Sequence, residues 1–494
     1  MKRRPEGLGP IIALDRRLAA PLHRQLYTGY RDAILDGRLR PGQRLPSTRS
    51  LARDLAISRI PVVTAFEQLA AEGYLEGKVG AGSFVSSALP EIAAKARAPR
   101  PPAGRRRLPR ERLASDPEPW LACWGGFRVG QPALDQFPAE MWARLIARRA
   151  RMQPRQQMTY GDAMGFVPLR QALADHLRTV RSVRCTAEQI MIVSGSQQAL
   201  ALASRAILAP GDAAWIEEPG FIGAHDALSL AGARVVPVPV DNAGLDVAAG
   251  IARCPSPRAV YVTPSHQYPL GVVMTAARRM HLLDYARKRG TWLLEDDYDS
   301  EYRYDQQPIA SLHGLDTDRR VIYIGTFSKS LFPAIRLGYV VIPDDLIERF
   351  RRVRAALDNF PPPLYQAALF DFMRDGHFAR HLRRTRAAYA ERRRALVLAL
   401  ERELGGIVQI VGDHAGMHLV ATLAHDDREI ATRAAARGLS VIPLSSCYVG
   451  RPRQRGLLLG YGATRATEIA DRVRELAQVI RESATTCSAT ATRS

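Results

Sequence analysis

The sequence GTFSKSLFPAIRLG, residues 325–338, directly follows the apolar run VIYI at residues 321–324, which is typical of a buried strand. It places Lys329 among hydroxyls and small residues, and Arg336 follows further along. A lysine that attacks a carbonyl must be neutral, so it needs a site that lowers its pKa. Hydroxyls and a fixed guanidinium are suited to binding a phosphate. The stretch therefore indicates a phosphorylated aldehyde held on Lys329 as a Schiff base, which is pyridoxal 5'-phosphate (PLP). A surface lysine in a Gly/Ser-rich turn is the alternative.

Apolar runs alternate with amphipathic helical patterns from residue 116 to residue 482. This alternation is typical of an α/β fold, with a mainly parallel sheet covered by helices on both faces. The expected strands include residues 190–193, 213–216, 259–262, 292–295 and 321–324. Ligands of such sheets bind beyond the carboxyl ends of the strands, so the polar residues that follow these runs are candidate site residues.

Two of the expected strands are followed by residues suited to a phosphate and to a ring. Ser196 and Gln197 open an alanine-rich helix after residues 190–193, and the free N–H groups of a helix start bind anions. A serine that only caps the helix is the alternative. Phe221 follows residues 213–216 and could stack on a cofactor ring, although taken alone it also fits a core position.

The acidic run EDDYDSE at residues 295–301 follows another expected strand. If the strand continues, Asp296 and Tyr298 point to the same face. A carboxylate beside a pyridine nitrogen keeps that nitrogen protonated, and a phenol can bind the ring hydroxyl. Crowded carboxylates also suggest a metal site, but the run contains no histidine and directly precedes the Lys329 strand, so no metal is expected.

The N-terminal residues 21–85 have the pattern of a winged helix-turn-helix. A first helix ends at Asp36-Gly37, a second begins at Ser47 or Thr48, and a third runs from about Ser58. A glycine-tipped hairpin follows at residues 73–85. In this arrangement the later helix of the pair enters the major groove of DNA with its N-terminal residues at the base edges.

The run LPSTRSLA at residues 45–52, followed by Ser58-Arg59, Val62 and Thr64-Ala65, resembles the GntR family of bacterial regulators over residues 12–86. By this resemblance Arg59 reads DNA from the start of the recognition helix and the wing approaches the minor groove. The DNA-binding residues that it implies are Arg49, Ser58, Arg59, Thr64, Lys78, Gly80 and Gly82. The chain departs from the family at Ile60-Pro61, where small polar residues are usual. Proline is tolerated in the first helical turn, but neither side chain can hydrogen bond to a base.

Composition bounds the remaining possibilities. The net charge of +21 favours a polyanionic partner such as nucleic acid, although arginine usage in a GC-rich genome would also produce it. The five cysteines are scattered, which indicates reduced thiols. No apolar run has membrane-spanning length and no signal-peptide core follows the N-terminus, so a cytoplasmic protein with no membrane partner is expected.

Two segments lack any apolar period. Residues 87–115 are rich in proline and arginine and are expected to form an extended linker. The Ser/Thr/Ala-rich tail, residues 483–494, is expected to be disordered. The predicted domains are therefore 12–86 for DNA binding and 116–482 for PLP binding.

Residues 116–482 resemble the fold-type I PLP enzymes, the aspartate aminotransferase fold. Within that superfamily the motifs TPSHQYPLG at 263–271, EDDYDSE at 295–301 and TFSK at 326–329 are similar to those of the MocR/GabR regulators, which fuse a GntR-type domain to an aminotransferase-like domain. The resemblance implies that Lys329 carries the Schiff base, Asp296 faces the pyridine nitrogen and Tyr298 faces the ring hydroxyl. It further implies that Phe221 stacks on the ring, that Tyr160 reaches the partner subunit's cofactor, and that the phosphate is held by Ser196, Gln197, Thr326, Ser328 and Arg336.

Several departures bear on catalysis. Tyr268 stands where aminotransferases of this fold usually have asparagine, and residues 456–461 lack the arginine that holds a substrate carboxylate. Cys447 lies in the segment where amino-acid-sensing relatives have an arginine, with Arg451, Arg453 and Arg465 as possible substitutes. A thiol does not replace a bidentate guanidinium, so productive transamination is not expected.

The sequence as a whole predicts a transcriptional regulator that binds an operator in double-stranded DNA and senses PLP, or an amino acid or amine that reacts with it. The resemblance implies a bacterial homodimer of head-to-tail type, located at the nucleoid through DNA binding. The alternative is a PLP-dependent aminotransferase whose DNA binding is incidental.

Overall fold

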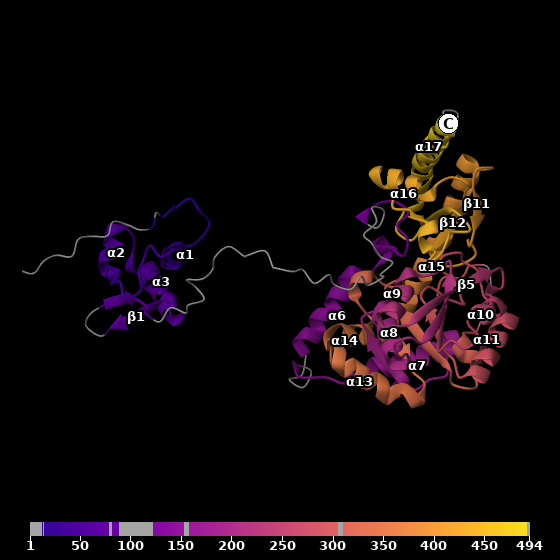
Figure 1. Ribbon diagram of the computed structural model, residues 1–494, viewed down its shortest axis with the longest axis horizontal. Coiled ribbons are helices and arrows are strands. Elements are labelled where there is room, and N and C mark those ends of the chain that lie inside the picture. Colours follow the sequence, from indigo (N-terminus) through magenta and orange to yellow (C-terminus); the bar gives the residue numbers. More distant parts are fainter. Residues whose placement is uncertain are drawn as a thin grey trace, which may run out of the picture. The chain divides into compact units, whose positions relative to one another are not determined.

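The computed structural model describes residues 12, 14–78, 82–87, 122–152, 158–304 and 310–491, with side chains described up to residue 483. The chain divides into two compact units, residues 1–110 and 111–494 (Figure 1). All but the first residue of the expected linker at 87–115 lies outside the described residues.

The smaller unit is a winged helix-turn-helix, as the sequence predicts. Its elements are α1 (Leu22–Leu35), α2 (Thr48–Asp54), α3 (Arg59–Ala71), β1 (Leu75–Lys78) and β2 (Gly82–Val85), the strands forming an antiparallel pair. Ser47 caps α2, its hydroxyl accepting a hydrogen bond of 3.1 Å from the Ser50 backbone N–H. Tyr30 and Phe66 pack edge to face at 5.4 Å and join α1 to α3 in a small apolar core.

The larger unit is built on an eight-stranded sheet of order β3-β10-β9-β8-β7-β4-β5-β6. Strands β4, β5, β7, β8 and β9 are mutually parallel, whereas β10 runs antiparallel to both of its neighbours and β6 antiparallel to β5. The strands are β3 (Ile190–Val193), β4 (Ala213–Glu218), β5 (Arg234–Asp241), β6 (Gly244–Leu245), β7 (Ala259–Val262), β8 (Trp292–Asp297), β9 (Val321–Thr326) and β10 (Gly338–Val341). All five strands predicted from sequence are confirmed.

Helices cover both faces of this sheet, as expected. Along β7, Ala259 and Tyr261 pack into one apolar cluster with α8 and α9, and Val260 and Val262 into another with α10 and α11. This alternation follows from the two-residue period of a strand. The helices are α6 (Ala139–Met152), α7 (Val167–Arg181), α8 (Ser196–Ile207), α9 (Ile222–Leu230), α10 (Val247–Arg253), α11 (Ala276–Arg289), α12 (Leu312–Leu315), α13 (Ile347–Leu357), α14 (Pro363–Arg374) and α15 (His377–Leu404). Short 3-10 turns occupy η1 (Leu134–Gln136), η3 (Ala187–Gln189), η4 (Pro333–Ile335), η5 (Asp344–Leu346) and η6 (Leu444–Cys447).

A second, antiparallel sheet of order β11-β12-β14-β13 completes the larger unit. Its strands are β11 (Gln409–Val411), β12 (His418–Thr422), β13 (Ile442–Pro443) and β14 (Gly456–Gly460), accompanied by α16 (Asp427–Ala436) and α17 (Ala466–Ala491). The expectation of a disordered tail from residue 483 needs correction, because α17 extends to Ala491 (yellow in Figure 1). Among the described residues, no helix combines the length and the hydrophobicity needed to cross a membrane.

Candidate functional site

A cavity of about 410 Å³ opens beyond the carboxyl ends of the main strands. Nine of the ten residues predicted to hold the cofactor line it, and Tyr160 does not. The lining consists of Val129, Gly130, Gly195, Ser196, Gln197, Phe221, Tyr261, Tyr268, Asp296, Tyr298, Asp299, Thr326, Ser328, Lys329, Pro333, Arg336, Met417, His418 and Ile442.

Lys329 lies in the turn that follows β9, with its amine in the cavity. Its Nζ donates a 3.0 Å hydrogen bond to the backbone carbonyl of Gly130. Burial lowers the pKa of Lys329, because the surroundings disfavour the charged ammonium. Gly130 makes room for the amine, since a Cβ there would lie 2.3 Å from Nζ. Burial thus shifts the amine towards the neutral form that carbonyl attack requires.

One side of the cavity gathers groups suited to a phosphate. Ser196 begins α8, whose cap residue Gly195 has a φ of 105°. The Arg336 guanidinium approaches this turn, with Nη1 3.6 Å from where a Cβ on Gly195 would stand. A helix N-terminus beside a guanidinium is a site for a dianion.

The remaining predicted phosphate ligands surround this turn or lie close by. Thr326 ends β9, and its hydroxyl accepts a 3.1 Å hydrogen bond from the Ser328 backbone N–H. The Gln197 side chain donates a 2.8 Å hydrogen bond to the carbonyl of Gly223. Its amide therefore already has a protein partner at the cavity wall.

Asp296 presents an unsatisfied carboxylate oxygen. The residue is 4% exposed, and Oδ2 accepts a 3.0 Å hydrogen bond from the Tyr261 hydroxyl. Oδ1 has no hydrogen-bond partner among the described residues. Burial raises the pKa of Asp296 to about 7. A buried acceptor without a donor fits a ligand that brings a protonated ring nitrogen, so the residues present fit PLP.

Three aromatic side chains form the apolar wall. Phe221 packs edge to face on Tyr268 at 5.9 Å, and Tyr268 on Tyr298 at 6.2 Å. The Tyr298 hydroxyl lies 3.0 Å from Nδ1 of His266. Tyr298 stands just beyond the end of β8, so the strand does not continue through it as the sequence argument supposed, yet it shares the cavity with Asp296.

Sequence reasoning did not single out His266, Asp299 and His418. One ring nitrogen of each histidine and one carboxylate oxygen of Asp299 lie within 4.8 Å of one another, and all three residues are buried. The signal available for His266 was its place in the polar stretch that follows β7, beside the acidic stretch that follows the neighbouring strand β8. His418 begins β12, which was not predicted as a strand.

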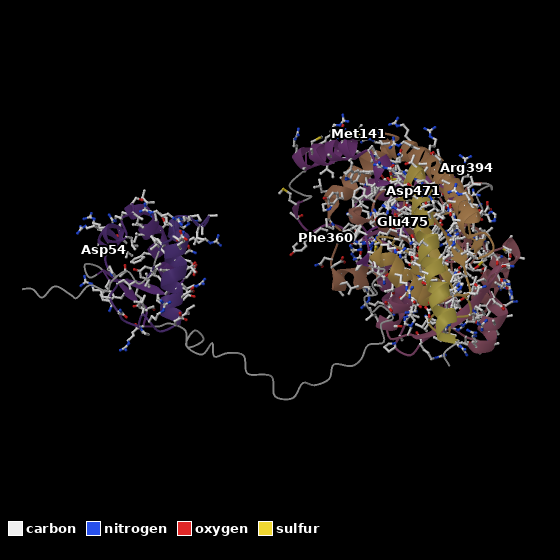
Figure 2. All side chains as sticks on the ribbon, turned by 90° about the horizontal axis from the view of Figure 1, so that it is seen from above. Asp54, Met141, Phe360, Arg394, Asp471 and Glu475 are labelled. Atoms are coloured by element: carbon white, nitrogen blue, oxygen red, sulfur yellow. The ribbon has the colours of Figure 1, made fainter. Side chains whose placement is uncertain are left out.

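Tyr160 lies away from the cavity. The residue is 86% exposed, and its ring packs edge to face on that of Phe360 at a centroid distance of 6.1 Å. Figure 2 shows Phe360 at the periphery of the larger unit. The expected contact of Tyr160 with a partner subunit's cofactor stays a prediction.

The residues considered as binding partners for the carboxylate of an amino acid do not line the cavity. Arg451, Arg453 and Arg465 are exposed. Cys447 is buried, and burial raises the pKa of its thiol to about 12, so it stays protonated beside the Tyr268 hydroxyl. Within the described parts of the chain, Arg336 is therefore the one arginine in the cavity wall.

The predicted DNA-binding residues that the structure describes are all exposed: Arg49, Ser58, Arg59, Thr64, Lys78 and Gly82. Gly80 lies outside the described residues. Ser58 is the cap residue of α3, and Arg59 at the start of α3 donates a 3.1 Å hydrogen bond to the Thr48 hydroxyl of α2. The Thr64 hydroxyl donates to the carbonyl of Ile60 at 3.1 Å, and the Lys78 amine lies over the Phe84 ring at 5.2 Å.

Comparison with known proteins agrees with both halves of this description. Residues 22–85 match the family of bacterial regulatory proteins known as gntR, and residues 125–467 match aminotransferase class I and II. The probable rhizopine catabolism regulatory protein MocR of Rhizobium meliloti is 41% identical over 91% of this chain and 92% of its own. The pyridoxine biosynthesis regulator PdxR of Corynebacterium glutamicum is 31% identical over 92% of this chain and 94% of its own.

Solved structures resemble the larger unit. The α-aminoadipate aminotransferase LysN of Thermus thermophilus, solved with a phosphopyridoxyl-leucine adduct, superposes with a TM-score of 0.69 at 28% identity. That match covers 74% of this chain and 94% of LysN. Because relatives that match over nearly the whole chain are named as a regulatory protein or as HTH-type transcriptional regulators, the comparisons support regulation over free-standing aminotransferase activity. The chain belongs to the MocR/GabR-type regulators of the GntR superfamily, in which a winged helix precedes an aminotransferase-like domain.

Proposed function

We propose that this regulator binds PLP as a Schiff base on Lys329 and that the bound cofactor, alone or together with an amine, alters its affinity for an operator. The observation that carries the proposal is the cavity itself. It combines a buried amine, a carboxylate with one unsatisfied oxygen and a helix N-terminus beside a guanidinium. Each of these groups would bind a different part of the same cofactor.

Different residues of the chain would bind different parts of the cofactor. Arg336, Ser196, Gln197, Thr326 and Ser328 would hold the phosphate. Asp296 would accept a hydrogen bond from the ring nitrogen, Tyr298 would bind the ring hydroxyl, and Phe221 would stack on the ring, as the family resemblance implies. When bound, the cofactor supplies an electrophilic carbon that an amine can attack.

The signal would be PLP itself, an amine or an amino acid. An amino-acid substrate needs a partner for its carboxylate, and the described cavity wall contains no arginine besides Arg336. This composition supports sensing of PLP or a simple amine over productive transamination. Turnover of an amino donor at roughly 1 s⁻¹ or faster would instead favour the enzyme alternative.

Family membership supports a proposal for assembly and location. We expect a head-to-tail homodimer that binds an operator in double-stranded DNA, with Tyr160 reaching the partner subunit's cofactor and residues 87–115 tethering the two domains. A regulator of this kind would act in the bacterial cytoplasm, at the nucleoid.

The visible spectrum of the purified protein with PLP tests the cofactor half of this proposal. A Schiff-base band is expected for the wild type and for Lys288→Ala, which removes a surface lysine of α11 that pairs with Asp284 at 2.6 Å. Lys329→Ala should lack the band. A band of equal intensity in Lys329→Ala would show that PLP reacts with another amine and would contradict the assignment.

A further inference from the structure

Tyr298 is backed by two buried side chains that the cofactor assignment does not use. His266 follows β7, and Asp299 follows β8 directly after Tyr298. Nδ1 of His266 lies 3.0 Å from the Tyr298 hydroxyl and 3.0 Å from Oδ2 of Asp299. The side chains of His266 and Asp299 are 1% and 2% exposed. One ring nitrogen thus faces two oxygen atoms away from solvent.

The chemistry of these oxygens fixes where the protons lie. A carboxylate oxygen only accepts hydrogen bonds, so Nδ1 of His266 must carry a proton that it donates towards Asp299. The same N–H faces the Tyr298 oxygen, which therefore accepts as well.

We propose that Asp299 and His266 are positioning residues that turn the Tyr298 phenol so that its own proton points into the cavity. This inference rests on the proposed function, because the acceptor in the cavity would be the ring oxygen of PLP. A phenol that donates to that oxygen stabilises its anionic form, and the oxygen then holds the proton of the Schiff-base nitrogen less firmly. The pair would therefore lower the pKa of the Schiff base on Lys329 without touching the cofactor.

The neighbouring titratable groups bear on any pH measurement of this site. Those around Tyr298 and His266 are Asp296 on β8, Tyr261 on β7, Tyr268, His418 on β12 and Lys329. Burial, followed by His266, lowers the pKa of His418 to about 3, and burial raises the pKa of Tyr298. Both groups therefore keep their protonation state near neutral pH. Burial raises the pKa of Asp296 to about 7 in the cavity without ligand, and this carboxylate would also contact the cofactor ring, so the comparison has to be made between variants that all retain it.

The test is a pH titration of the Schiff-base band in the full-length protein loaded with PLP. Asp299→Asn removes the carboxylate that holds a proton on Nδ1 of His266, so Nδ1 can instead accept the hydrogen bond of the Tyr298 hydroxyl, which turns the phenol proton away from the cavity. We expect the Schiff-base pKa to rise by about one unit, and by a similar amount in Tyr298→Phe. The double variant should shift no further than either single variant, because both act through one hydrogen bond. His266→Leu removes the donor by another route and should give the same shift.

Glu295→Gln is the matched control. It removes a buried carboxylate of β8 that instead accepts hydrogen bonds from the backbone N–H groups of Leu312 and His313, and it should titrate like the wild type. An unshifted Asp299→Asn beside a shifted Tyr298→Phe, or shifts that add in the double variant, would overturn the inference. A wild type that forms no band would instead contradict the proposed function.

Discussion

At the scale of single residues, Asp296 links the cofactor site to stability. Burial raises its pKa from 3.8 to about 7 in the cavity without ligand. The folded state therefore holds the proton more tightly than the unfolded chain, and its stability falls as the pH rises from about 4 through about 7. One pKa unit corresponds to about 1.4 kcal/mol, so the penalty reaches a few kcal/mol above neutral pH.

Asp296→Asn should remove this penalty. Without PLP we expect equal melting temperatures of variant and wild type at about pH 4, and a more stable variant at about pH 9. Added PLP should stabilise the wild type more than the variant at high pH, because a protonated ring nitrogen pairs with the carboxylate. Asp345→Asn, at an exposed position in η5, serves as control. A difference between Asp296→Asn and wild type that does not vary with pH would be inconsistent with a buried, titrating carboxylate.

Gly130 offers a second test at this scale. Its φ of 75° and its contact with Lys329 both favour glycine. Gly211 has a similar φ of 91°, but a Cβ there would stand in open space, so only its backbone conformation favours glycine. Gly130→Ala and Gly211→Ala should each lose about 1 kcal/mol of stability, because both alanines adopt the left-handed region. Gly130→Ala alone should weaken PLP binding, by about tenfold or more, since its Cβ displaces the amine. Equal PLP affinity of the two variants, measured from the Schiff-base band, would refute this role of Gly130.

Sequence reasoning predicted some residues around the cavity and missed others, and the reason is geometric. Lys329 and Asp296 lie at or just beyond the ends of apolar strands, and parallel strands bring such residues to one edge of the sheet. The contact of His266 with Tyr298 and Asp299 depends on the conformations of the segments that follow β7 and β8. No sequence periodicity encodes those conformations, so the contacts of His266 with Tyr298 and Asp299 were visible only in the structure.

At the scale of elements, the start of α3 would determine which bases the winged helix can recognise. Ile60 is 75% exposed at the second position of this helix. Pro61 follows in the first turn, where a backbone N–H has no partner within the helix, so the helix forms despite it. An exposed aliphatic side chain at the N-terminus of a recognition helix is suited to contact the methyl group of thymine.

We therefore expect Ile60 to recognise one thymine methyl. Replacing that thymine by uracil in an operator selected in vitro should weaken wild-type binding about fivefold, or roughly 1 kcal/mol. Ile60→Ser should bind both DNAs equally, and Leu35→Ser, at the exposed end of α1, should discriminate like the wild type. If the wild type ignores uracil at every position while Ile60→Ser still loses affinity, Ile60 has another role.

The strands that were predicted are continuous hydrophobic runs, although β10 and β14 are equally apolar and were not singled out. The five apolar strands have that character, whereas β5 contains Pro237 and Pro239 and was missed. Along residues 234–239 this strand pairs only with β4, so the prolines cost no bond on the other side. The C-terminal segment was mistaken for a disordered tail because serine and threonine dominate it, yet its alanines favour the continuation of α17.

At the scale of the whole molecule, the domain order and both folds followed from motifs, because each domain carries its own. The motifs do not predict how ligand binding affects DNA binding, because such coupling requires that the ligand bind one of two arrangements of the protein more tightly than the other. Such coupling between sites is typically worth 1–3 kcal/mol, or roughly 5- to 150-fold in affinity. The sequence provides the two sites but not the sign of their coupling.

The most direct test of the account is an operator-binding titration of the full-length protein with and without PLP, run beside Lys329→Ala. We predict that PLP changes the wild-type operator affinity at least about fivefold and leaves Lys329→Ala unchanged. The reciprocal measurement, PLP affinity with and without operator, should show the same factor. An operator affinity that PLP and added amines leave unchanged in the wild type, or change equally in Lys329→Ala, would contradict the claim that this cavity controls DNA binding.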